Sequence, residues 1–181
     1  MRHDLTFSSG PYTLRPLQES DQAPLMLLAQ ANAAEYAQMI TPPTLERYYL
    51  NALNAEDQQP FVALVGGAYA GATRYMEMRL AHRRLEIGST WLAPAHMCTP
   101  ANRTFKRLLL GHAFETLGAL RVEIKTDLLN LRSQRAIEGL GAVREGVLRQ
   151  HMPRLDGSQR DTVLYSIVAA EWPAVRARLG G

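Results

Sequence analysis

The sequence predicts a mixed α/β fold, in which helices flank one central sheet. Segments that alternate apolar and polar residues take turns along the chain with segments whose apolar residues recur at helical spacing. This alternation is typical of a mixed sheet covered by helices. Of the 181 residues, 46% are hydrophobic and 20% are charged, so the chain can bury a full core. No internal repeat or linker interrupts the pattern, and we expect one domain over residues 1–181.

The N-terminal half is expected to contain one strand, two helices and then three strands. The first strand covers residues 12–17, and Ser20 or Asp21 can cap the helix that follows it. Thr44 can cap a second helix that reaches about residue 55. Three strands follow at 61–65, 68–78 and 85–93, and a Gly66–Gly67 turn joins the first two.

The C-terminal half is expected to alternate helix and strand before a closing hairpin. One helix, at residues 108–117, ends at Gly118, and a second begins at Asn130 and ends at Gly141. The remaining elements are strands at 122–127, 143–152 and 162–168, a hairpin turn at Asp156–Gly157 and a short helix at 171–179. The expected order of elements is therefore βααβββαβαββα.

Charge, hydropathy and cysteine content argue against several classes of function. The net charge of +3 is not gathered into a basic run, so no direct nucleic-acid binding is expected. No apolar run is long enough to span a bilayer, so no membrane partner is expected. Cys98 is the single cysteine, which fits a reducing cytoplasm. His82, His96, His112 and His151 lie in different segments without zinc spacing, so no metal site is expected.

The most informative segment is the helix that begins at Asn130, because it follows directly after a predicted strand. Ligands of open α/β sheets bind at such carboxyl ends of strands. Residues 130–142 carry the pattern Asn-x-x-Ser-x-x-Ala-Ile-Glu-x-Leu-Gly-Ala. This pattern resembles the GNAT acetyltransferases, specifically the RimJ/RimL-type protein N-acetyltransferases. The resemblance implies a mostly antiparallel mixed sheet whose fourth and fifth strands splay apart to admit the pantetheine arm of acetyl-CoA.

The predicted fourth strand resembles the Glu-Ile-Gly-x-x-Trp-Leu stretch of that family. The resemblance implies that Glu86 accepts the proton of the substrate amine, and that Gly88, Trp91 and Leu92 lie at the cofactor. Other interpretations of these residues stay open. Glu86 is otherwise a surface carboxylate paired with a neighbouring arginine, Arg83 or Arg84; Gly88 otherwise marks a β-bulge; and Trp91 is otherwise part of the core or of a groove wall.

A second match covers the start of the predicted pyrophosphate loop and helix. Residues 97–106 resemble the family pattern Trp-Arg-Thr-Gly-x-Asn-x-x-x-Lys, in which Thr99, Asn102 and Lys106 match. Two positions depart from the pattern, because Cys98 replaces the arginine and Pro100 replaces the glycine. Thr99 is a good N-cap and proline is well tolerated next to it, yet proline offers no N–H to a phosphate. The alternative interpretation of Asn102 and Lys106 is that both are solvated first-turn residues.

The helix after the fifth strand carries the last two candidates. Asn130 can cap this helix, and the resemblance implies that it also contacts the cofactor. Ser133 lies on the same helix face, where it could bind the cofactor or protonate the departing CoA thiolate. Many family members place a tyrosine on this helix for that proton transfer, but the nearest position here is Ile137. Ser133 is otherwise an ordinary polar residue of the first turn.

The resemblance implies an acetyl-CoA-dependent N-acetyltransferase that uses no metal. The expected acceptor is a primary amine, above all the α-amino group of a protein or peptide. Two alternatives stay open, namely acetylation of a small amine (an amino acid, polyamine or aminoglycoside) and non-catalytic binding of acyl-CoA. The expected partners are acetyl-CoA, the amine acceptor and a second copy of the chain in a homodimer.

Overall fold

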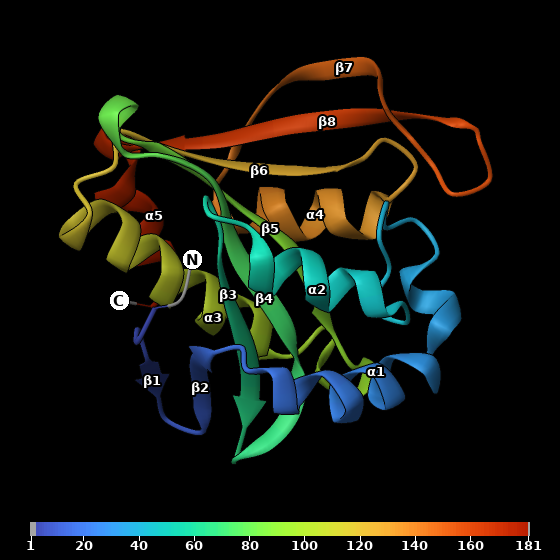
Figure 1. The fold of residues 1–181 in the computed structure, drawn as a ribbon. Coiled ribbons are helices and arrows are strands. Elements are labelled where there is room, and N and C mark those ends of the chain that lie inside the picture. The colour runs from blue at the N-terminus through green and yellow to red at the C-terminus, as the bar shows by residue number, and fades with distance from the viewer. Residues whose placement is uncertain (1–2, 181) are drawn as a thin grey trace.

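A computed structural model describes residues 3–180, and over these residues one eight-stranded sheet forms the centre of the molecule (Figure 1). The strand order is β1-β2-β3-β4-β5-β6-β8-β7, and all neighbours are antiparallel except β5 and β6. The strands are β1 (Phe7–Ser9), β2 (Tyr12–Pro16), β3 (Gln59–Val65), β4 (Ala68–Arg79), β5 (Arg84–Leu92), β6 (Arg121–Asp127), β7 (Val143–Pro153) and β8 (Gln159–Val168). The α-helices are α1 (Gln22–Gln30), α2 (Glu46–Asn54), α3 (Pro100–Gly111), α4 (Leu131–Leu140) and α5 (Trp172–Arg178).

The predicted order of elements is confirmed, with one additional strand at the N-terminal end. This strand, β1, pairs with β2 across a turn at Gly10, whose φ of 56° is left-handed. Because β1 has only three residues, alternation of apolar and polar residues could not reveal it. Helix α3 also begins earlier than the predicted residue 108, at Pro100, and continues beyond Gly111 as a π-helical turn over His112–Thr116.

Two predicted helix caps are wrong because other interactions occupy these residues. Asp21 precedes α1 without a cap hydrogen bond, since its buried carboxylate forms an ion pair with Arg15 at 2.7 Å. Ser20 lies inside the 3₁₀ turn before that helix. Helix α2 begins after Leu45, with no side-chain cap, so Thr44 does not start it.

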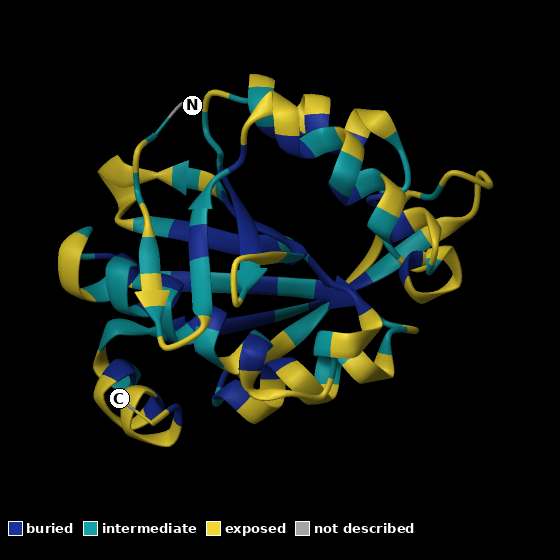
Figure 2. Cartoon of the chain, turned by 90° about the horizontal axis from the view of Figure 1, so that it is seen from below, coloured by how far each residue is buried: buried dark blue, intermediate teal, exposed yellow. Residues whose placement is uncertain are grey.

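Helices cover both faces of the sheet and create two apolar cores. Helices α1 and α2 contribute to the core on one face, and α3, α4 and α5 contribute to the core on the other. Neighbouring strand residues serve opposite cores, since Phe61 of β3 belongs to the α3 side and Val62 to the α1 side. Figure 2 shows the central strands largely buried between helices whose outer surfaces are exposed, whereas the edge strand β7 is mostly exposed. No helix within residues 3–180 has the length and apolarity needed to cross a bilayer.

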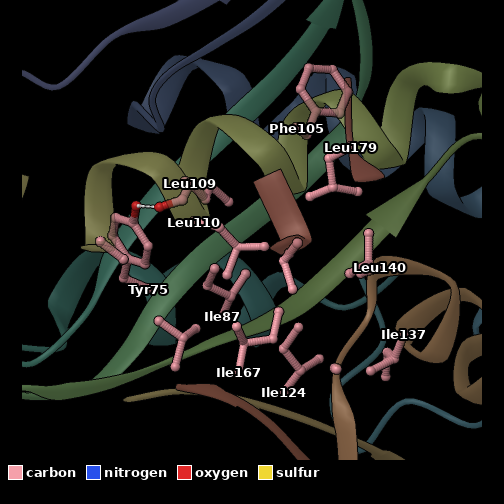
Figure 3. Packing of buried hydrophobic residues seen from close by; sticks show 14 of the residues in the cluster. Tyr75, Ile87, Phe105, Leu109, Leu110, Ile124, Ile137, Leu140, Ile167 and Leu179 are labelled. Atoms are coloured by element: carbon pink, nitrogen blue, oxygen red, sulfur yellow. Dashed lines mark hydrogen bonds between the residues drawn. The ribbon is translucent and has the colours of Figure 1, made fainter. Parts of the chain in front are cut away.

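The larger core fixes α3 against the sheet. Tyr75 of β4 and Ile87 of β5 pack there with Phe105 and Leu109 of α3 (Figure 3). The hydroxyl of Tyr75 donates a hydrogen bond of 2.6 Å to the carbonyl of Leu109, so this buried polar atom has a partner. These contacts hold α3 against β4 and β5.

Strands β5 and β6 diverge after a short parallel contact. Their ladder pairs residues 84–86 with residues 121–123 and goes no further, although β5 continues to Leu92 and β6 to Asp127. Parallel neighbours elsewhere in proteins hydrogen-bond along their length, so the missing pairs open a gap in the sheet. The splay predicted between the fourth and fifth strands is therefore confirmed, at β5 and β6.

Candidate active site

A cleft of about 1280 Å³ extends along the gap between β5 and β6. The sequence-predicted site residues all line it, namely Glu86, Gly88, Trp91, Leu92, Thr99, Asn102, Lys106, Asn130 and Ser133. They come from β5, α3, α4 and the turns before these helices, so the fold gathers side chains that are far apart in the chain. Within residues 3–180, no three His, Cys, Asp or Glu side chains lie together in a way that could hold a metal ion.

A β-bulge interrupts β5 directly after Gly88. Ser89 and Thr90 lie opposite the single residue Thr73 of β4, and Ser89 has a left-handed φ of 47°. Such a bulge frees backbone groups from the ladder and re-aims them. A Cβ at Gly88 would lie 2.7 Å from Oε1 of Glu86, so the glycine is needed for the carboxylate to occupy this place. The bulge considered from the sequence is thus present, one residue after the glycine.

Glu86 is buried at the mouth of the gap and forms an ion pair across it. Its Oε2 lies 2.8 Å from Nζ of Lys125 on β6, which also lies 3.1 Å from Glu123. Partial burial lowers the pKa of Lys125, but the two carboxylates outweigh it and the pKa rises. The alternative interpretation, in which Glu86 pairs with Arg83 or Arg84, is wrong. Arg84 lies 3.8 Å from Glu123, and Arg83 donates to a loop carbonyl.

Lys106 is a buried cation that lies beside the bulge. Its Nζ donates a hydrogen bond of 2.6 Å to Oγ1 of Thr90, which lies 2.7 Å from Oγ1 of Thr73. Burial lowers the pKa of Lys106 to about 7, although Glu86 opposes the shift. Only 5% of Lys106 is exposed, so its interpretation as a solvated residue is wrong. The lysine instead binds the hydroxyl of Thr90, which also lines the cleft.

The N-terminal end of α3 forms one end of the cleft wall. Oγ1 of Thr99 accepts a hydrogen bond of 3.2 Å from the N–H of Ala101, so Thr99 is the predicted N-cap. Pro100 occupies the first helical position, where its missing N–H costs the helix nothing. Cys98 is exposed, with a left-handed φ of 57°, and half-buried Asn102 lies in the first turn. Free N–H groups of this turn can bind an anion, with Pro100 supplying none.

The N-terminal end of α4 borders the cleft from the β6 side. Oδ1 of Asn130 accepts a hydrogen bond of 3.0 Å from the N–H of Ser133, which confirms the predicted cap. Gly141 ends the helix with a left-handed φ of 101°, also as predicted. Ser133 is half-buried and lines the cleft. Ile137 also borders the cleft, but it is buried and packs in the core on the α3 side.

Aromatic side chains close the cleft from the α1 and α2 side. The hydroxyl of Tyr48 donates a hydrogen bond of 2.6 Å to the carbonyl of Ser89, which supports the bulge from outside the sheet. The rings of Tyr36 and Trp91 meet edge to face, with centroids 5.4 Å apart. Trp91 is therefore a wall of the cleft, and its buried Nε1 has no hydrogen-bond partner within residues 3–180.

Comparison with known proteins identifies the family of this chain. Residues 12–143 match the family described as "Acetyltransferase (GNAT) domain". The chain belongs to the GNAT acetyltransferase family. It is thus an N-acetyltransferase, and the predicted mixed fold is that of its GNAT neighbours.

Several relatives of named origin are similar over most of their length. A Bacillus subtilis protein named as a ribosomal N-acetyltransferase, YdaF, is 28% identical over 143 residues, which are 78% of this chain and 74% of that protein. An acetyltransferase structure from T. thermophilus is 36% identical, with a TM-score of 0.87 over 99% of this chain and 97% of that chain. RimJ of Mycobacterium smegmatis, in complex with CoA-disulfide, shares the fold at 24% identity, with a TM-score of 0.80 over 94% and 88% of the two chains. The predicted similarity to RimJ/RimL-type GNAT proteins is confirmed.

The cleft of this GNAT protein also contains cationic side chains that were not predicted from the sequence. Arg103 on α3 and Arg135 on α4 line the cleft, are exposed and form no described ion pair within residues 3–180. Both follow closely after a predicted site residue, and this proximity was the only indication of their role in the sequence. Arg74 of β4 also lines the cleft, and its signal in the sequence was a charge in the mostly apolar first part of a strand. Neither signal could be interpreted before the strands and helices were placed in space.

Proposed function

We propose that this GNAT protein transfers the acetyl group of acetyl-CoA to the α-amino group of a protein or peptide. The observation that carries the proposal is the cleft between β5 and β6, because an extended pantetheine arm needs a gap in the sheet. The N-terminal turns of α3 and α4 border the same cleft and can take the pyrophosphate. Arg103 and Arg135 lie near these turns and supply positive charge. Cys98, which stands at the position of the family's arginine, supplies none.

In the proposed reaction, the neutral amine attacks the thioester carbon directly. Backbone N–H groups near the bulge at Gly88 to Thr90 stabilise the oxyanion, and the carbon–sulfur bond then breaks. Glu86 accepts the ammonium proton, directly or through water, from its buried place at the mouth of the gap. Ser133 protonates the departing thiolate or binds the cofactor. Cys98 is exposed and lies before α3, and no covalent intermediate on it is proposed.

The charges of the cleft favour a peptide over a polycationic acceptor. The carboxylates that line it each form an ion pair with an arginine or lysine, namely Glu35, Glu77, Glu86, Glu123 and Asp127. A polyamine or aminoglycoside needs free carboxylates, and none of these five is free. The name of the Bacillus subtilis relative refers to a ribosomal acceptor, which supports a protein substrate.

The proposal is tested by measuring CoA release from acetyl-CoA with a panel of N-terminal peptides, free amino acids, polyamines and aminoglycosides. We expect peptides with a free α-amino group to be acetylated, and the same peptides with a blocked N-terminus to be inert. Turnover of polyamines alone would contradict the proposal. Titration calorimetry with acetyl-CoA separates the enzyme from a non-catalytic acyl-CoA-binding protein, which would bind the cofactor and release no CoA with any amine. The homodimer and the cytoplasmic setting stay predictions.

A further inference from the structure

We infer that Arg74 binds a carboxylate of the acceptor, so that the preferred substrate is a peptide with an acidic side chain in its first two residues. The inference rests on the proposed transfer to a peptide α-amino group. It concerns the end of the cleft that faces α2 and the first half of β5, away from the pyrophosphate turns.

The first argument is the balance of charge in the cleft. Its carboxylates are all neutralised by ion pairs, but four of its cations have no described carboxylate partner within residues 3–180. These four are Arg74, Arg103, Lys106 and Arg135. Arg103 and Arg135 are exposed beside the turns proposed for the cofactor phosphates, and Lys106 is bonded to Thr90. Arg74 is left as a buried positive charge that neither the fold nor the cofactor neutralises.

The second argument is the environment of the Arg74 guanidinium. Only 4% of the residue is exposed, yet the described partners of its Nη atoms are neutral. They are Oε1 of Gln58 at 3.0 Å and the carbonyl of Tyr48 at 3.2 Å, and the guanidinium also lies 4.3 Å from the centroid of the Tyr48 ring. A guanidinium has five N–H donors, so donors are left over for the cleft. Buried charges are normally paired with an opposite charge, and a substrate carboxylate would supply it.

The third argument is the place of Arg74 relative to the proposed reaction. Arg74 of β4 is the direct cross-strand partner of Gly88, and the next pair on the same face of the sheet is Met76 with Glu86. Arg74 and Glu86 are therefore on one face, on either side of Met76 and Gly88. An amine held near Glu86 brings the side chains of the first two acceptor residues within reach of Arg74. A planar guanidinium can bind such a carboxylate through two parallel hydrogen bonds.

The test compares matched peptides in direct competition. One pair begins with Glu or Gln, and the other carries Ala followed by Glu or Gln; all four share the remaining sequence. We expect the wild-type protein with acetyl-CoA to prefer the acidic member of at least one pair by about ten- to hundred-fold in kcat/KM, the range of a hydrogen bond to a charged group. Added salt should reduce the preference only slightly, because a buried pair is screened little.

Three variants assign the preference to Arg74. Arg74→Met keeps the length of the side chain and removes the charge, so the ratio should fall to about one. Arg74→Lys keeps the charge without the fork and should retain part of the ratio. Arg103→Met, on the cofactor side, should raise the KM for acetyl-CoA and leave the ratio unchanged. Because both peptides compete for the same enzyme molecules, partial unfolding of a variant does not alter the ratio.

The outcomes separate this inference from the proposed function. If peptides are acetylated without an acidic preference, or if Arg74→Met keeps that preference, the inference is wrong and the proposed function stands. If free amino acids are acetylated and peptides are not, the proposed function fails. In that case Arg74 still recognises a carboxylate only if free amino acids are acetylated in preference to their amides and Arg74→Met removes this preference. If nothing is acetylated, the four peptides are titrated onto the CoA-loaded protein, and equal binding of acidic and amide forms refutes the inference.

Discussion

Replacing Lys106 by methionine should change how the stability of the protein depends on pH. Lys106 is 5% exposed, hydrogen-bonded to Thr90 and without a described ion pair within residues 3–180. Burial lowers its pKa in the folded protein from 10.5 to about 7, with Glu86 acting in the opposite direction. Methionine has a similar length and no charge, so Lys106→Met removes this titration and keeps most of the buried volume.

The sign of the effect follows from proton binding. Between pH 7 and pH 10.5 the unfolded chain carries a protonated lysine and the folded protein a mostly neutral one, so the unfolded state binds more protons. The contribution of Lys106 to the free energy of unfolding therefore increases with pH in this window, by about 1.4 kcal/mol per pH unit. Below pH 7 both states are protonated, and the full destabilising effect of the buried charge is present. Over two pH units above 7.5, the expected change is about 3 kcal/mol.

The assay is urea unfolding of the wild type and Lys106→Met at pH values from 6 to about 9.5. Groups common to both proteins cancel in the difference between their free energies of unfolding. This difference should be constant near pH 6 and then shift in favour of the wild type as pH rises. A difference that stays flat across the whole range would refute the reasoning, because it would show that Lys106 keeps an ordinary pKa in the folded state.

Three further predictions concern the cleft. Glu86→Gln should lower turnover more than acetyl-CoA binding, and the pH-rate profile should lose its acidic limb, because an amide cannot accept the ammonium proton. Gly88→Ala should also lower turnover, since its Cβ would lie 2.7 Å from Oε1 of Glu86 and displace the carboxylate from Lys125; activity equal to wild type would show that this placement is unimportant. Pro100→Gly should tighten acetyl-CoA binding about ten-fold in calorimetry, because it restores an N–H worth about 1.5–3 kcal/mol to a charged group, less up to about 1 kcal/mol of backbone freedom.

These variants have matched controls. Glu77→Gln changes an exposed carboxylate that lines the same cleft and should leave the acidic limb in place. Gly139→Ala lies on α4, where a Cβ meets no atom within 4 Å, and should not lower turnover. Cys98→Arg should tighten acetyl-CoA binding in a salt-dependent way, in contrast to Pro100→Gly. If neither change improves binding, the turn before α3 is not the phosphate site.

Apart from the short strand β1, the sequence alone determined the order of elements, and it determined the ends of α4. These features depend on residues that are neighbours in the chain, because periodicity sets strands and helices and local side chains set caps. Asn130 and Gly141 bound α4 as predicted, and Thr99 starts α3. The motif of residues 130–142 was enough to identify the family, and the residues predicted for the site do line one cleft.

The tertiary structure decided what surrounds each charge. One interpretation of Glu86 paired it with Arg83 or Arg84, its neighbours in the chain. It pairs instead with Lys125, which only the parallel contact of β5 and β6 brings within 2.8 Å. Lys106 was open to interpretation as a solvated residue, and the packing of α3 against β5 buries it instead. Burial and long-range ion pairs are properties of elements meeting in space, so no local pattern encodes them. For this reason the sequence could gather the candidate residues, whereas their partners and protonation emerged only from the fold.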